Sequence, residues 1–122
     1  PEHFEALLWS THYEFQTGDA QKARSRLRVL TRLEPANPVV VGFREIDSLS
    51  TLLRVLSSPE DRGSLYLDMS RIYERIGLPE EALDMADRAW KARPEEARRR
   101  TAEILTTTGR TSGAERYTRS LN

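Results

Sequence analysis

The chain lacks cysteine, and only two of its 122 residues are histidine. Without cysteine, disulfide bonds, Cys-ligated zinc and thiol catalysis are excluded. His3 and His12 are nine residues apart, so more than two turns of a helix would separate them and they cannot share a metal ion as an i, i+4 pair would. There is also no glycine-rich phosphate loop and no nucleophile elbow. The sequence therefore predicts no enzyme and no cofactor or metal site.

Long apolar runs and an excess of one charge are lacking too. No apolar stretch approaches the roughly 20 residues that a membrane-spanning helix needs. The 19 basic and 19 acidic residues cancel, and they also cancel separately on each side of Ser57. We therefore expect no membrane insertion of this segment and no nucleic-acid partner. Because the chain starts at Pro1 without a signal-peptide pattern, we interpret it as a segment of a longer protein.

Glycine and proline are few, and they separate stretches with helical periodicity. Six breaks leave seven segments long enough for helices, and no alternating pattern indicates a strand. Several breaks also start a new helix, as in Ser58-Pro59, Pro79-Glu80-Glu81 and Pro94-Glu95-Glu96, where a proline or capping hydroxyl precedes acids in the first turn. The connections are short, so successive helices should be antiparallel neighbours. The predicted fold class is all-α.

One stretch carries a repeat pattern. Its spaced positions are Tyr66, Met69, Ser70, Tyr73, Gly77, Ala82, Ala86, Ala89 and Pro94. This pattern resembles the tetratricopeptide (TPR) motif, in which an aromatic residue, a small residue, a turn glycine and three small or aromatic residues recur at that spacing. The resemblance implies a TPR-like α-solenoid of antiparallel helix pairs, with about seven helices here. Small residues at Ser70 and Ala82 should let the paired helices approach closely.

Two further copies are less regular. The earlier one reads Leu7, Ser10, Thr11, Glu14, Gly18, Ala23, Leu27, Leu30 and Pro35; the later one reads Arg98, Thr101, Ala102, Leu105, Gly109, Ala114, Thr118 and Leu121. Ser10 and Glu14 depart from the motif, which fits a rotated first helix or a missing neighbour. We expect one domain over residues 1–122, made of a repeat at 1–37, an irregular helix at 38–57, a repeat at 58–94 and a truncated repeat at 95–122.

The irregular helix lies in a stretch, from Gly18 to Gly77, that is about 25 residues longer than one repeat. Its apolar side chains share one helical face, so a single helix from about Pro38 to Ser57 is predicted; they are Phe43, Ile46, Leu49, Leu53 and Leu56. A collapsed repeat and an inserted helix both explain it.

Charged and aromatic clusters have two interpretations each. The run Arg98-Arg99-Arg100 follows Glu95 and Glu96 at i, i+4, which favours a solvated face over an acidic-partner patch. The second helix has basic residues without intervening acids, which indicates either an acidic-ligand site or a solvated face balanced by neighbouring helices; these residues are Lys22, Arg24, Arg26, Arg28 and Arg32. Trp9 and Trp90 either anchor a partner or pack between repeats, and packing is favoured.

The TPR resemblance also implies a binding surface. In that family the first helix of each pair lines a concave groove, at positions ten, six, three and two before the turn glycine. Carried over, these positions are Leu8, His12, Phe15 and Gln16; Leu67, Arg71, Glu74 and Arg75; and Arg99, Glu103, Thr106 and Thr107. The Lys and Asn that grip a terminal carboxylate in one TPR subgroup are missing, which disfavours a chaperone-tail ligand.

The resulting hypothesis is a protein-protein interaction scaffold that binds a partner protein or peptide. The chain has seventeen arginines and two lysines, which hints at a GC-rich bacterium, where such arrays often organise envelope export machinery, including exopolysaccharide secretion. The periplasm is then favoured over the cytoplasm. The rivals are a ligand-sensing regulatory domain and an RNA-binding helical repeat, and self-association is left open.

Overall fold

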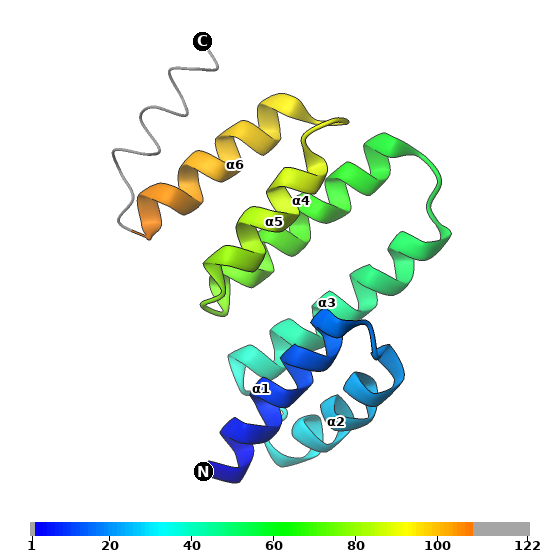
Figure 1. Ribbon diagram of the computed structural model, residues 1–122, viewed down its shortest axis with the longest axis vertical. Helices are drawn as coiled ribbons and strands as arrows, with labels where there is room; N and C mark the ends of the chain where they lie inside the picture. The colour runs from blue at the N-terminus through cyan, green and yellow to red at the C-terminus, as the bar shows by residue number, and fades with distance from the viewer. Residues whose placement is uncertain (1, 109–122) are drawn as a thin grey trace. The chain divides into compact units, whose positions relative to one another are not determined.

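The computed structural model describes residues 2–108, and this part of the chain is all-helical (Figure 1). Its six α-helices are α1 (Glu2–Thr17), α2 (Ala20–Leu33), α3 (Pro38–Val55), α4 (Pro59–Arg75), α5 (Pro79–Ala89) and α6 (Pro94–Thr107). No strand occurs within these residues. The all-α prediction is confirmed for them, and the seventh predicted helix lies outside the described residues. None of the six helices is both long and apolar enough to cross a bilayer.

The chain divides into two compact units within α3. The first extends to Ser48 and the second begins at Leu49. α3 begins at Pro38 as predicted and ends at Val55, close to the expected Ser57. A single helix therefore occupies the irregular stretch.

The first unit contains α1, α2 and the beginning of α3. α2 turns a stripe of Ala23, Leu27 and Leu30 inward, spaced at the helical period. Phe43 of α3 is only 1% exposed, and its ring stacks on His12 of α1, with ring centroids 5.9 Å apart. The core of this unit therefore joins side chains from all three helices.

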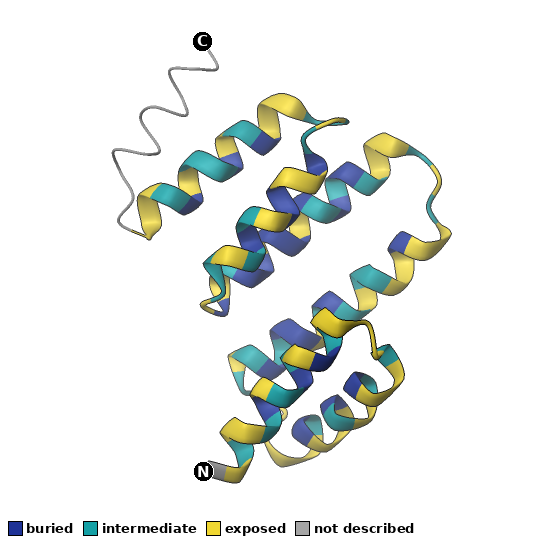
Figure 2. Cartoon of the chain, viewed as in Figure 1, coloured by how far each residue is buried: buried dark blue, intermediate teal, exposed yellow. Residues whose placement is uncertain are grey.

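The second unit contains the rest of α3 followed by α4, α5 and α6. α4 packs along α5, and α6 packs against both (Figure 1). The inner face of α5 consists of Ala82, Ala86 and Ala89, each fully buried. Alanines let the neighbouring backbones come close. Figure 2 shows the result as a buried stripe on the inner side of each of these helices and exposed residues on the outer side.

The pairing of α4 and α5 confirms the predicted role of two small residues. Ser70 and Ala82 are both fully buried, and the Ser70 hydroxyl donates a hydrogen bond to the Ala82 carbonyl at 2.7 Å. One turn earlier in α4, Leu67 is 2% exposed and packs with Ala89 and Ala97; its burial contributes roughly 2 kcal/mol. A larger side chain at Ser70 would push the helices apart and break this hydrogen bond.

The turns of α1–α2 and α4–α5 have related geometry. Gly18 and Gly77 adopt φ angles of 89° and 86°, in the left-handed region that glycine enters without steric cost. The amide of the next residue donates back to the helix in both turns: Asp19 to the Glu14 carbonyl at 3.0 Å, and Leu78 to the Tyr73 carbonyl at 2.8 Å. This is the long hydrogen bond of a Schellman motif. Each glycine therefore ends one helix and lets the chain reverse.

Side chains cap three of the helix starts within residues 2–108: Ser58, as predicted, and also Asp19 and Asn37. Asp19 accepts from the Lys22 amide at 3.2 Å, and Ser58 accepts from the Asp61 amide at 3.4 Å. Asn37 caps α3 by accepting from the Val39 amide at 2.9 Å. These bonds satisfy amides that have no partner within the helix. α5 and α6 instead begin with a proline followed by two glutamates, which suit the positive end of the helix dipole.

The register of α1 matches that of α4. Thr11 is fully buried, as Ser70 is, and Glu14 is 8% exposed, close to the 9% of Tyr73. α1 is therefore not rotated away from its partner helix. Glu14 stands where the repeat motif has a tyrosine. Its buried carboxylate is stabilised by an ion pair, because it accepts a hydrogen bond from Arg26 Nε of α2 at 2.7 Å.

Candidate functional site

The four predicted contact residues of α1 do not share one environment. Leu8 is 7% exposed and belongs to the core, so its side chain is not presented to a partner. His12 and Phe15 are half-buried, and Gln16 is exposed. The accessible part of this predicted set is therefore its second half, near the end of the helix.

An exposed aromatic patch on α1, formed by Trp9 and Tyr13, is absent from the predicted set. Trp9 is 50% exposed and Tyr13 is 64% exposed, and the two side chains lie one turn apart on the same side of the helix. Trp9 therefore does not pack between the helices of its own unit, and its packing between repeats stays a prediction. The sequence feature that could have revealed this patch is the i, i+4 spacing of Trp9 and Tyr13. The contact positions taken from the repeat motif include neither residue.

Ring contacts connect Trp9 of the aromatic patch to the core of the first unit. The Trp9 ring meets the His12 ring edge-on, with centroids 6.1 Å apart, and His12 in turn stacks parallel on the buried Phe43. Aromatic pairs at these separations are favourable beyond their buried area. The row Trp9, His12 and Phe43 thus connects the surface of α1 to the core of the first unit, which restricts the orientation of the indole.

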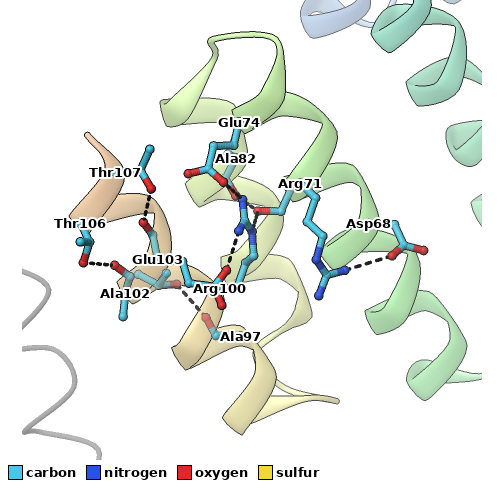
Figure 3. Close-up of polar contacts among 12 residues, drawn as sticks. Asp68, Arg71, Glu74, Ala82, Ala97, Arg100, Ala102, Glu103, Thr106 and Thr107 are labelled. Atoms are coloured by element: carbon cyan, nitrogen blue, oxygen red, sulfur yellow. Dashed lines mark hydrogen bonds and ion pairs between the residues drawn. The ribbon is translucent and has the colours of Figure 1, made fainter. Parts of the chain in front are cut away.

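The predicted contacts of α4 divide into buried and exposed positions. Leu67 is core, while Arg71 and Arg75 are exposed. Arg71 donates to the Asp68 carboxylate at 3.1 Å, an exposed i, i+3 pair of small energetic value (Figure 3). Arg71 can therefore turn toward an incoming acidic group at little cost.

Glu74 and Glu103 are brought together by a buried arginine. Arg100 of α6 is 5% exposed; its guanidinium contacts the Glu74 carboxylate and donates to Glu103 at 2.8 Å, while Nε donates to the Ser70 hydroxyl at 3.2 Å (Figure 3). A charge at this depth needs such partners. Glu74 and Glu103 therefore have a structural role here, which the family positions did not indicate.

This burial corrects the interpretation of the run Arg98-Arg99-Arg100. Only Arg99 is exposed as a solvated face requires. The predicted pairing of Glu96 with Arg100 is wrong, because Glu96 binds Arg93 at 3.2 Å instead. Arg98 lies over the Trp90 ring at 5.4 Å from its centroid, and Trp90 packs against the core cluster of Leu67, Ala89 and Ala97. Trp90 thus packs between helices, as predicted.

The remaining contact residues predicted on α6 are Arg99, Thr106 and Thr107, and all three are exposed. The threonine hydroxyls donate to carbonyls one turn earlier in their own helix, at 2.8 Å each. This side of α6 therefore offers methyl groups and a single cation.

The basic second helix is partly balanced by its neighbours, as one of its two interpretations required. Arg24 Nε donates to Asp47 of α3 at 2.8 Å, and Arg26 pairs with Glu14 of α1. Lys22, Arg28 and Arg32 are exposed. The charges of α2 therefore fall into a paired inner group and an outer group.

Two observations concern the chemistry of titratable side chains. Burial raises the pKa of Tyr73 to about 12, and the Glu81 carboxylate adds to the shift. Within residues 2–108, no three histidine, aspartate or glutamate side chains are grouped so that they could hold a metal ion.

Comparison of the sequence with models of known protein families finds no match, and no curated protein is similar to it at a significant level.

Proposed function

We propose that this chain is a binding segment of a helical-repeat scaffold, of the TPR type, that holds a partner protein or peptide. The observation that carries the proposal is the aromatic patch of Trp9 and Tyr13, half or more exposed although both rings are large and apolar. Tryptophan, tyrosine and arginine are the residue types that contribute most to protein-protein binding energy. The proposed role is recognition, with no chemical step.

The patch suits an apolar anchor in the partner. Trp9 is held from below by His12, so little side-chain freedom is lost when a partner covers it. On α4 of the second unit, Arg71 and Arg75 are exposed and would pair with acidic side chains. A segment with an apolar residue suits the aromatic patch of the first unit, and a segment with acidic residues suits the two arginines of the second unit.

The wider setting follows from the resemblance and the arginine-rich composition. It is a longer TPR-type array in a bacterial envelope export or exopolysaccharide secretion assembly. The competing hypotheses are a ligand-sensing domain and an RNA-binding repeat. The experiment below has an outcome that would favour each of them.

The test is a crosslinking pull-down from lysate of the source cells with the 122-residue chain as bait. One variant carries Trp9→Ala and Tyr13→Ala. Its matched control carries Val29→Ala and Leu33→Ala, which removes two exposed apolar residues at the same i, i+4 spacing from α2. A second test variant carries Arg71→Glu and Arg75→Glu.

A protein captured by the native chain and the control, and lost with the Trp9/Tyr13 variant, would support the proposal. Loss with the arginine variant as well would extend the binding surface to α4. Equal capture by all forms would contradict the assignment of the patch. Capture of RNA in place of protein would favour the RNA-binding hypothesis, and thermal stabilisation by a small metabolite without any protein would favour ligand sensing.

A further inference from the structure

A basic pocket lies between α2 and α3 in the first unit, away from the aromatic patch. Its volume is about 500 Å³, in the range of ligand-binding pockets. Four arginines and one aspartate line it, so its formal charge is +3; the charged lining residues are Arg24, Arg28, Arg32, Arg44 and Asp47. The remaining lining includes Leu27, which is 5% exposed and forms an apolar floor.

Within the described part of the chain, some of the charged residues that line this pocket have an ion-pair partner and others do not. Arg24 pairs with Asp47 across the two helices at 2.8 Å, so this arginine already has a charge partner. Arg28, Arg32 and Arg44 are exposed, and among residues 2–108 no acidic side chain forms an ion pair with them. Three like charges around one hollow repel each other, and a bound anion would relieve that repulsion.

Spacing indicates what kind of anion fits. Arg24, Arg28 and Arg32 follow each other at i, i+4 and i+8, so they rise along α2 in steps of about 6 Å. Because Arg24 is already paired with Asp47, the part of the row available to a ligand is Arg28 and Arg32, about 6 Å apart, with Arg44 on α3. Carboxylates on successive turns of a helix have a spacing of about 6 Å, and those on alternate residues of a strand are about 6.6 Å apart.

The lining also argues against nucleic acid. Binding of single-stranded nucleic acid combines a basic groove with aromatic side chains on which bases stack. Among residues 2–108, no aromatic residue lines this pocket. Arginine, in contrast, binds carboxylates through two parallel hydrogen bonds, and its methylene groups pack on apolar surface.

We propose that the pocket between α2 and α3 binds an acidic peptide segment whose carboxylates pair with Arg28, Arg32 and Arg44. This inference is independent of the function proposed for the aromatic patch, because it rests on other residues. Asp47 repels other carboxylates near Arg24, so Arg24 is not counted among the binding residues.

The test is fluorescence anisotropy with the full chain and a labelled synthetic peptide that carries glutamate at every fourth position. A peptide with glutamine at those positions is the ligand control. The pocket variant is Arg28→Gln with Arg44→Gln. The matched protein control, Lys22→Gln with Arg54→Gln, removes the same charge from exposed positions outside the pocket.

We expect the glutamate peptide to bind with an affinity that falls as salt is added, and the glutamine peptide not to bind. The pocket variant should weaken binding at least tenfold, and the control variant less than twofold. Asp47→Asn should tighten binding several-fold, because it removes the one lining carboxylate. Circular dichroism would verify that all variants are folded.

The proposal is overturned if the glutamate peptide does not bind at millimolar concentration, or if both protein variants lose affinity equally. It is also overturned if inorganic phosphate displaces the peptide more effectively than chloride at equal ionic strength, since the site would then be one for a small anion. A single-stranded oligonucleotide that binds tighter than the peptide, and is weakened by the pocket variant, would reassign the site to nucleic acid.

Discussion

Arg100 of α6 donates from Nε to the hydroxyl oxygen of Ser70 on α4, at 3.2 Å. That hydroxyl has only one proton, and it is donated to the Ala82 carbonyl of α5 at 2.7 Å. The serine therefore offers only lone pairs to α6. One short chain of hydrogen bonds therefore joins α4, α5 and α6 in the second unit.

Removal of the buried guanidinium should therefore destabilise this unit. Arg100→Met leaves the Glu74 carboxylate without its charge partner, and we expect a loss of about 3 kcal/mol in the free energy of unfolding. Urea denaturation would measure it. Arg99→Met, at the exposed neighbouring position, should change stability by less than about 0.5 kcal/mol.

A double variant separates the cost of the unpaired charge from the cost of lost packing. Arg100→Met combined with Glu74→Met should be more stable than Arg100→Met alone, because neither charge then remains. If the double variant is the less stable of the two, the Glu74 contact is not what makes Arg100 important.

The two turn glycines should be sensitive to backbone strain alone. A Cβ atom added at Gly18 or Gly77 would meet nothing within 4 Å, yet both residues have positive φ. We expect Gly77→Ala to lower the free energy of unfolding by about 1 to 2 kcal/mol, and Gly18→Ala similarly. Asparagine tolerates this conformation better, so the Gly→Asn variants should lose less. Alanine variants as stable as the native chain would argue against the left-handed turns.

Alkaline pH should selectively weaken the packing around Tyr73. The pKa of this buried hydroxyl is about 12, compared with about 10 in the unfolded chain. Its contribution is complete below pH 10 and is lost as the pH rises toward 12, because the unfolded state ionises first. The loss amounts to up to about 3 kcal/mol.

The Tyr73→Phe variant isolates this effect. Urea denaturation of both forms between pH 8 and pH 11.5 should show similar stability at pH 8 and a smaller decline for the phenylalanine variant. Parallel declines would mean that the Tyr73 hydroxyl ionises as easily in the folded protein as in the unfolded chain.

The two tryptophans should differ in solvent access. Trp9 is 50% exposed, whereas Trp90 packs against a buried cluster. In Trp90→Phe the remaining Trp9 fluorescence should be quenched efficiently by acrylamide. In Trp9→Phe the remaining Trp90 should be quenched more weakly. The reverse order would place the aromatic patch in contact with another part of the protein, or with a second copy.

Local chemistry explains why most helix boundaries could be predicted. The breaks at Gly18, Asn37, Ser58 and Gly77 combine a residue with special backbone freedom or a capping side chain with an apolar period on each side. The paired small residues Ser70 and Ala82 were likewise predictable, because a close helix approach requires small side chains wherever the partner comes from.

The candidate site was less predictable, because exposure depends on which neighbours cover a residue. Repeat positions selected Leu8 and Leu67, which the core covers, and omitted Trp9 and Tyr13. Arg100 was misinterpreted for the same reason. Its acidic neighbour four residues earlier, Glu96, suggested an intrahelical pair, whereas two of its partners, Ser70 and Glu74, are distant in the sequence.

The buried guanidinium also specifies how far α6 slides along α4. A shift of one turn would place Glu96 or Ala97 on one side, or Glu103 or Ile104 on the other, opposite Ser70 and Glu74. A glutamate there would face another carboxylate, and alanine or isoleucine would leave that carboxylate buried without a donor. Only one alignment of α6 satisfies its neighbours, so a single long side chain determines the register of α6 on α4.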